Sequence, residues 1–206
     1  MNSKIIRKSI FYLFLAAVLF VYVLPVLWML GSSFKPIQEV FRSVLRFWPQ
    51  RINFDNYVGV LQKRPFLRYL GNSIVVATGS TAISVFVSAL AGFGFAKYNF
   101  AGKKALFWAV LSTIMIPIQI VMIPLFLQIR NYGWLDSYLG LIIPVSVTAF
   151  GTFLMRQFIA SIPKSYLEAA RMDGLSEWGI FWKIILPMSK PALSMLAIYA
   201  FTRSWN

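Results

Sequence analysis

Carboxylates are the side chains of this sequence best suited to acid–base chemistry, because the chain contains neither histidine nor cysteine. The six of them are Glu39, Asp55, Asp136, Glu168, Asp173 and Glu177. A hydrolase needs paired carboxylates, a metal cluster or a nucleophile with a base beside it. No serine here has a histidine to activate it. We therefore predict that the chain is not an enzyme, and we expect no metal site and no cofactor.

The positions of these acids also bear on transport driven by ion gradients. All six fall between the strongly apolar segments of the chain, and none falls within one. A transporter coupled to protons or sodium usually keeps an ionisable group inside the membrane. The distribution disfavours secondary transport, so a transport function would need its energy from another source.

The composition is that of an integral membrane protein. Of the 206 residues, 59% are hydrophobic and only 13% are charged, which lies outside the usual range of soluble domains. The net charge is +14, and the cations lie in short loops between apolar runs. We interpret them as topogenic charge beside anionic membrane lipid, and we expect no nucleic-acid partner.

Five apolar segments follow one another, at residues 10–30, 70–95, 105–127, 139–155 and 191–206. Each of the first four has at least about 17 residues, the lower end of the range for a transmembrane helix. The last rises only about 24 Å. We predict an all-α integral membrane protein, a polytopic helix bundle with four full spans and part of a fifth. Lys4, Arg7 and Lys8 place the N-terminus in the cytoplasm.

Two features of the first third leave alternatives open. Residues 10–30 could be a cleaved signal peptide, although no convincing cleavage site follows them. Residues 31–69 should form an external loop whose aromatic side chains anchor at the interface. This loop conflicts with the positive-inside bias because it carries the cations Lys35, Arg42, Arg46, Arg51, Lys63, Arg64 and Arg68.

Small side chains recur every four residues in the second span, at Ser80, Ser84, Ser88 and Gly92. This spacing places them on one helix face, where they let another helix approach closely in lipid. The alternative is that they line a polar path through the membrane.

Prolines interrupt the third and fourth spans and predict kinks, since each removes a backbone hydrogen bond. The alternative is a flexible segment that lines a pathway, because freed carbonyls in lipid need partners in protein or water. Arg203 would lie near the middle of the membrane, where a charge is costly. The candidate pathway or hinge residues are Pro117, Gln119, Pro124, Pro144 and Arg203.

The segment 156–190 is too polar to span a membrane and is expected to fold as two short helices. Residues 164–173 contain good helix formers after Pro163. Gly174 suits a left-handed helix end. Ser176 can cap a second helix, with Glu177 favourable at its positive end, and Pro187 is expected to stop that helix.

The same segment carries a spaced motif: Glu168-Ala169-Ala170, three residues, Gly174, nine residues, then Ile184-x-Leu186-Pro187. It resembles the cytoplasmic "EAA" loop of binding-protein-dependent ABC importer permeases, in which an aspartate such as Asp173 is also usual. Further stretches resemble the second permease of the maltose-importer type. These are Asn56-Tyr57, Asn72-Ser73, Phe95-Ala96-Lys97, Ile123-Pro124-Leu125, Phe153-Leu154-Met155-Arg156, Ile162-Pro163, Lys190-Pro191-Ala192 and Trp205-Asn206.

The resemblance implies a single importer transmembrane domain over residues 1–206, incomplete at its C-terminus, with 156–190 as the cytoplasmic coupling loop. It implies that the loop docks on a separate ATPase. The coupling residues would be Glu168, Ala169, Ala170, Asp173, Gly174, Ile184, Leu186 and Pro187.

By the same resemblance, the partners are two ABC ATPase subunits, a homologous second permease, an extracytoplasmic solute-binding protein and membrane lipid. The location would be a bacterial or archaeal cytoplasmic (inner) membrane, and the solute a sugar or a related compound. Two alternatives stay open: a permease for peptides or amino acids, and a membrane fragment or scaffold that is not coupled to ATP.

Overall fold

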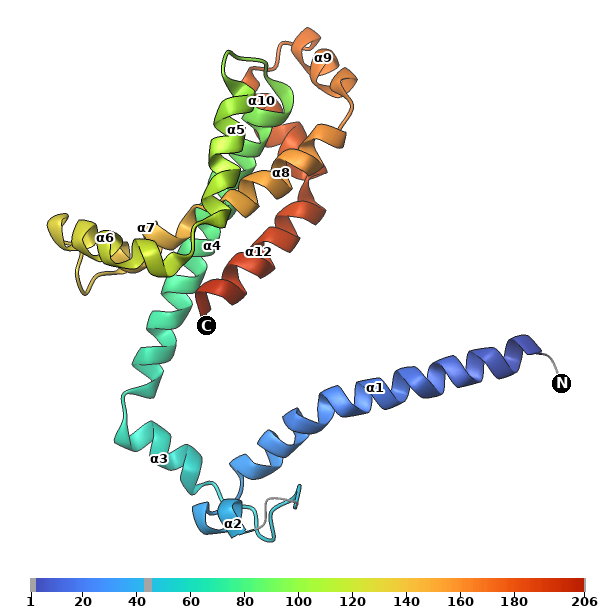
Figure 1. The fold of residues 1–206 in the computed structure, drawn as a ribbon, viewed down its shortest axis with the longest axis vertical. Helices are drawn as coiled ribbons and strands as arrows, with labels where there is room; N and C mark the ends of the chain where they lie inside the picture. The colour runs from blue at the N-terminus through green and yellow to red at the C-terminus, as the bar shows by residue number, and fades with distance from the viewer. Residues whose placement is uncertain (1–2, 43–45, 206) are drawn as a thin grey trace. The chain divides into compact units, whose positions relative to one another are not determined.

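The computed structural model describes residues 3–42 and 46–205, and every regular element in those residues is a helix. The predicted all-α class is therefore confirmed. The chain divides into two compact units, residues 1–69 and 70–206. They are described separately below, and Figure 1 gives the helix labels used for both.

Unit 1 consists mainly of one long helix, α1, which runs from Ser3 to Ser33 and contains Pro25 without ending there. It encloses the predicted span at residues 10–30. Its apolar side chains are exposed within the chain, as expected for a helix that faces lipid or another protein. Two short helices follow, α2 (Ile37–Arg42) and α3 (Asp55–Lys63).

The segment after α1 is held to α3 by hydrogen bonds and by aromatic packing. The Asn56 amide donates to the carbonyls of Ser33 at 3.0 Å and Lys35 at 2.8 Å. The Lys35 side chain is only 1% exposed, and its ammonium donates to the carbonyl of Arg46. The ring of Phe34 packs on Tyr57, with centroids 5.4 Å apart. Lys35, one of the cations of the basic segment 31–69, is therefore used for a structural contact within unit 1.

Helix α4 has 32 residues, from Phe66 to Lys97, and all of it from residue 70 onward belongs to unit 2. A turn leads to α5 (Lys103–Ser112), the single 3-10 turn η1 (Thr113–Met115) and α6 (Ile118–Asn131). Next come α7 (Tyr138–Ser146) and α8 (Ala149–Ser161). The chain continues through α9 (Lys164–Met172), α10 (Glu177–Ile180), the π-helical turn η2 (Phe181–Ile185), α11 (Leu186–Met188) and α12 (Lys190–Trp205).

The predicted third and fourth spans are each divided between two helices. The run α5–η1 meets α6 at an angle of 102°, and Pro117 precedes the first residue of α6. The angle between α7 and α8 is 47°, and the break lies at Val147–Thr148 rather than at Pro144. Thr148 caps α8 by accepting a hydrogen bond from the Gly151 amide at 3.1 Å. Pro124 lies inside α6 without ending it.

In the described residues, α1 and α4 are each long and apolar enough to cross a membrane alone. The number rises to as many as five if each bent helix pair counts as one span. The division into four full spans and part of a fifth therefore stays a prediction.

The core of unit 2 forms where α4 crosses α8. A Cβ atom on Gly92 would lie 2.6 Å from the Cβ of Met155, and one on Gly151 would lie 2.3 Å from the Ser88 hydroxyl oxygen. Only glycine permits this approach, and Met155 is fully buried beside it. Of the four small side chains on this face of α4, Ser88 and Gly92 therefore allow close helix packing, as one of the two interpretations predicts.

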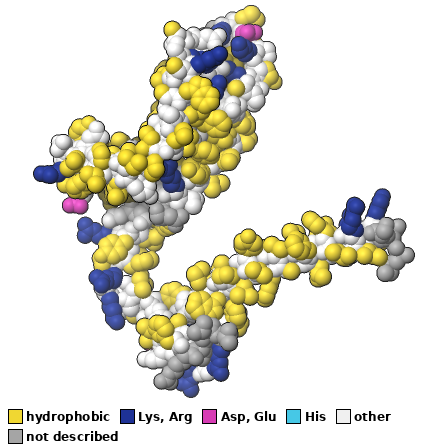
Figure 2. Space-filling model, in the orientation of Figure 1, with side chains coloured by type: hydrophobic (Ala, Val, Ile, Leu, Met, Phe, Trp, Pro, Cys, Tyr) yellow, Lys and Arg dark blue, Asp and Glu magenta, His cyan; other side chains and the backbone are white. Residues whose placement is uncertain are grey.

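Figure 2 shows hydrophobic side chains over most of the visible face of unit 2, with Lys and Arg side chains gathered at the end that holds α9 and the 98–102 turn. This separation of charge and apolar surface matches a bundle that lies in lipid with one basic end in water.

Candidate functional site

The segment 164–188 folds as two helical stretches joined at a glycine. Gly174 has a φ of +80°, in the left-handed region that favours glycine, and it follows the last turn of α9. The Ser176 hydroxyl then accepts a hydrogen bond from the Gly179 amide at 3.2 Å and so caps α10. These local features are those that the sequence predicts. Pro163 lies at the N-cap of α9, one residue before the helix begins.

The second stretch does not stop at Pro187 but runs on to Met188, which corrects the expectation for that proline. The turn before it is π-helical, and the Leu186 amide bonds to the carbonyl of Phe181. A widened turn of this kind takes up the irregular backbone bonding that precedes a proline inside a helix.

One face of α9 is built into the core of unit 2. Leu167 is 2% exposed, Ala170 is also buried, and both belong to the cluster that contains Phe93 of α4 and Ile159 of α8. Ile184 and Leu186 are half-buried and pack against the same cluster. These four motif-region side chains therefore connect the loop to the membrane helices.

The opposite face of α9 is open to solvent. Glu168 and Ala169 are exposed, as are Asp173 and Gly174 at its end. Met172 is 87% exposed, more than any other large apolar side chain in residues 164–188. The structure thus places Ala170 on the inner face of the motif helix and the other motif residues of α9 on the outer face. Pro187 is exposed as well, in α11.

A small polar network fastens the two stretches to each other and to α4. The Arg171 guanidinium donates to Glu177 through Nε at 2.7 Å and through Nη2 at 3.3 Å. The Tyr98 hydroxyl, just beyond α4, donates to Glu177 Oε2, the oxygen that also accepts from Nη2 of Arg171. The Lys97 ammonium donates to the carbonyl of Ile162 at the end of α8. Glu177 therefore bridges the Gly174 turn.

The protonation of this network follows from its bonds. Hydrogen bonds from Arg171, and then from Tyr98, lower the pKa of the Glu177 carboxyl below its ordinary value. Burial, and then the hydrogen bond to Glu177, raises the pKa of Tyr98 to about 12. The carboxylate thus stays charged and the phenol stays a donor throughout the neutral range.

The sequence gives little sign of this network. Tyr98 and Glu177 are far apart in the chain, and Arg171 and Glu177 are six residues apart, which is not a helical spacing. The one feature of the sequence that could have indicated the Arg171–Glu177 contact is the predicted left-handed turn at Gly174, since such a turn folds the second helix back toward the first.

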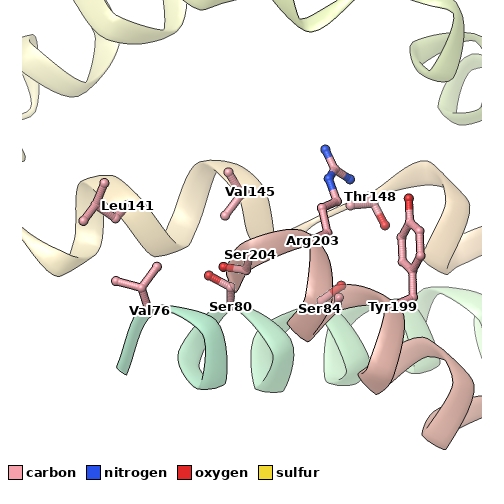
Figure 3. Close-up of a pocket in the computed structure, with 10 residues that line it drawn as sticks. Val76, Ser80, Ser84, Leu141, Val145, Thr148, Tyr199, Arg203 and Ser204 are labelled. Atoms are coloured by element: carbon pink, nitrogen blue, oxygen red, sulfur yellow. The ribbon is translucent and has the colours of Figure 1, made fainter. Parts of the chain in front are cut away.

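A cavity of about 240 Å³, lined by both polar and apolar side chains, lies between α4, α7 and α12. Figure 3 shows the hydroxyls of Ser80, Ser84 and Tyr199 around it, together with the guanidinium of Arg203. The Ser80 hydroxyl is buried without a hydrogen-bond partner among the described residues. Both interpretations of the small residues on α4 therefore apply, each to a different part of the helix. Ser80 and Ser84 line a cavity, whereas Ser88 and Gly92 pack against α8.

A second cavity, of about 650 Å³, shares Thr148, Tyr199 and Arg203 with the first. Pro117 and Pro144 also line it. Three of the five candidate pathway residues thus meet at one cavity. Gln119 and Pro124 are exposed on α6 and do not line it. Ile118 and Val121 of the same helix do line the cavity, so Gln119 and Pro124 lie on another side of α6.

Comparison with known proteins gives a consistent set of likenesses. Residues 84–206 match the family model described as binding-protein-dependent transport system inner membrane component. The chain is 34% identical over 204 residues to the arabinooligosaccharides transport system permease protein AraQ of Bacillus subtilis (strain 168). The aligned region covers 98% of this chain and 72% of AraQ. It is 30% identical over 188 residues to the diacetylchitobiose uptake system permease protein NgcG of Streptomyces coelicolor, covering 90% of this chain and 62% of NgcG.

A solved structure supports the same relationship. The fold superposes with a TM-score of 0.86 on a chain from the crystal structure of a bacterial ABC transporter involved in the import of the acidic polysaccharide alginate. The two sequences are 27% identical, and the match covers 100% of this chain and 73% of the other.

Proposed function

This chain belongs to the family of binding-protein-dependent transport system inner membrane components and is a permease of that class of ABC importer, and we propose that it imports a carbohydrate and is coupled to a separate ATPase through residues 164–188. The proposal for coupling has one main support, the two-faced packing of α9. Its inner face lies in the core with α4 and α8, while its outer face presents Met172 to solvent.

This arrangement suits the transmission of a movement. A partner that displaces α9 from outside would displace the core side chains Leu167 and Ala170 with it, since close-packed interiors transmit strain. The Arg171–Glu177–Tyr98 network ties the same helix to α10 and to the end of α4. Closure of an ATPase on ATP would therefore rock the membrane helices between two access states.

Substitutions on the outer face of α9 test the coupling role. Met172→Asp should lower the affinity for the ATPase subunit by at least tenfold, because it places a charge where an apolar side chain meets the partner. The measurement is co-purification of the full chain with its ATPase in mild detergent, with solute-stimulated ATP hydrolysis as a second readout.

Met172→Leu is the matched control, since it keeps the size and the apolar character of the side chain and should retain binding. The thermal midpoint of both variants should equal that of the unmodified chain, because Met172 is almost fully exposed. Full assembly and full stimulated ATP hydrolysis in Met172→Asp would contradict the docking role.

The proposed assembly contains this permease, a homologous second permease, two ATPase subunits and an extracytoplasmic solute-binding protein. The membrane is a bacterial or archaeal inner membrane, crossed several times from a cytoplasmic N-terminus. The basic end of unit 2 supports this orientation, since it carries the coupling loop and the 98–102 turn.

A carbohydrate is the proposed solute because AraQ, NgcG and the alginate importer are named for oligosaccharides or a polysaccharide. The two cavities at Arg203 form part of the proposed path. Hydroxyl groups at Ser80, Ser84 and Tyr199 can exchange hydrogen bonds with sugar hydroxyls. A charge at membrane depth costs several kcal/mol unless it faces water or a polar partner, and the cavity supplies that surrounding for Arg203.

A further inference from the structure

A pocket of about 640 Å³ lies between α5 and α8, apart from the cavities at Arg203 and from the outer face of α9. Its lining divides into two parts. Lys103, Lys104 and Arg156 provide positive charge. Trp108 and Leu111 of α5, with Phe153 of α8, provide an apolar surface. None of the described residues that line it carries a carboxylate, so these residues offer a net positive charge to a ligand.

The cationic part of the pocket is held in place by contacts of its own. The Arg156 guanidinium lies over the ring of Phe107, 3.9 Å from the centroid. Stacking on one face leaves the N–H edge of a guanidinium available to oxyanions. The Lys103 ammonium donates to the carbonyl of Tyr98 at 2.7 Å and retains two further N–H groups. These side chains are positioned for a phosphate group.

The apolar part continues along the same helix face. Lys104, Trp108 and Leu111 are spaced four and three residues apart, which places them in a row along α5. Trp108 is 69% exposed beside the charges, where tryptophan is favoured at a membrane interface. A ligand that fills the row must be charged at one end and apolar along the rest of its length.

We propose that this pocket binds an anionic phospholipid, with its phosphate between Lys104 and Arg156 and the upper part of an acyl chain along Trp108 and Leu111. Asn99 of the 98–102 turn also lines the pocket, so the pocket lies at the end of unit 2 where Lys and Arg side chains gather in Figure 2. The proposed orientation places that end in the cytoplasmic leaflet. That leaflet carries anionic headgroups, and its negative potential attracts clustered Lys and Arg. A soluble phosphate would use only the cationic part.

Native mass spectrometry of the full chain in mild detergent, titrated with phosphatidylglycerol or phosphatidylcholine, tests the proposal. The unmodified chain should bind one phosphatidylglycerol at least tenfold more tightly than phosphatidylcholine. Lys104→Gln with Arg156→Gln should reduce this preference to less than twofold. Lys4→Gln with Arg7→Gln removes the same charge outside the pocket and should keep the preference. Equal binding of the two lipids by the unmodified chain, or equal losses in both double variants, would overturn the proposal.

Two further arms identify the ligand and guard against misfolding. Lys104→Gln alone changes an exposed side chain and should weaken phosphatidylglycerol binding at an unchanged thermal midpoint; unaltered binding would count against the site. Displacement of the lipid by glycerol 3-phosphate at equal concentration would assign the pocket to a soluble phosphate. Release of the lipid when the ATPase is added would assign it to a protein interface. Either result refutes the proposal, and retention through both supports it.

Discussion

Glu177 is the acidic side chain with the most contacts in the coupling region, and it acts as a structural link between helices. Its carboxylate binds Arg171 before the Gly174 turn and Tyr98 beyond α4. Exposed ion pairs contribute little by themselves, so the link matters mainly because it limits the motion of a loop that otherwise rests on one apolar face. Its strength depends on the charge of the carboxylate.

At this scale we predict that acid loosens the loop. The folded-state pKa of Glu177 lies below its ordinary value, so its contribution is complete above that ordinary value and is lost as the pH falls through the folded-state pKa. The raised pKa of Tyr98, about 12, keeps its donor in place until strongly alkaline pH. The loop should therefore stay ordered at neutral and mildly alkaline pH, and become mobile as the pH falls through the folded-state pKa of Glu177, which lies below the ordinary value of 4.5.

A fluorophore on Ser165→Cys reports this change through its anisotropy, and labelling is unique because the chain has no cysteine. Glu177→Gln should give the low, mobile anisotropy already at neutral pH, with no further step in acid. An identical acid transition in both proteins would show that another group controls the loop.

Two glycines of unit 2 determine how its helical elements meet. Gly174 gives the coupling loop its turn through a backbone conformation, and Gly92 lets α4 and α8 approach through the lack of a side chain. The two requirements are physically different, so substitutions at the two sites should fail for different reasons.

At Gly174 we predict that the tolerance of a substitution follows its preference for left-handed backbone. No atom lies within 4 Å of a Cβ built there, so crowding is not the difficulty. A β-branched residue should cost about 1–2 kcal/mol or more of local folding free energy. Gly174→Val should therefore weaken ATPase binding strongly and Gly174→Asn only slightly, as measured by co-purification. Equal effects of the two would exclude a conformational cause.

At Gly92 we predict a loss of stability from crowding. A Cβ there would lie 2.8 Å from the Arg156 amide nitrogen, a backbone atom that cannot move aside easily. Gly92→Ala should lower the free energy of unfolding by about 1–3 kcal/mol, the usual cost of overpacking. The thermal midpoint in detergent measures it. Gly94→Ala, on the same helix with open space around its Cβ, is the control and should leave the midpoint unchanged.

At the scale of the whole molecule, the proposed function requires that the loop 132–137 and the coupling loop lie on opposite sides of the membrane. The route between them passes through α7 and α8, which together form one bent candidate span. The charges at their two ends differ in number, with Arg156 and the coupling-loop cations at the end of α8. This asymmetry supports the proposed cytoplasmic position of the coupling loop.

Labelling of single cysteines in intact cells checks this topology. A membrane-impermeant maleimide should label Asn131→Cys, which is exposed at the end of α6, without permeabilisation. It should label Ser165→Cys, exposed on α9, only after the membrane is opened. Labelling of both positions in intact cells would contradict the proposed crossing by α7 and α8.

The sequence by itself determined the features that depend on neighbouring residues. The apolar runs gave the all-α class, because buried or lipid-facing backbone must bond internally. Gly174 and Ser176 predicted the turn and the cap of the coupling loop, since both preferences are local. The spacing of Ser80, Ser84, Ser88 and Gly92 predicted a single helix face. The family relationship also followed from local spacing.

Which distant side chains meet could be learned only from the folded chain. Tyr98 reaches Glu177, and Lys35 is buried on the carbonyl of Arg46, through turns that no local preference specifies. Pro117, Pro144 and Arg203 share a cavity with Ile118 and Val121 of α6, whereas Gln119 and Pro124 are exposed elsewhere on that helix. The chain bends by 102° before α6. A bend angle depends on packing between helices rather than on proline alone, and the cavity follows from that packing.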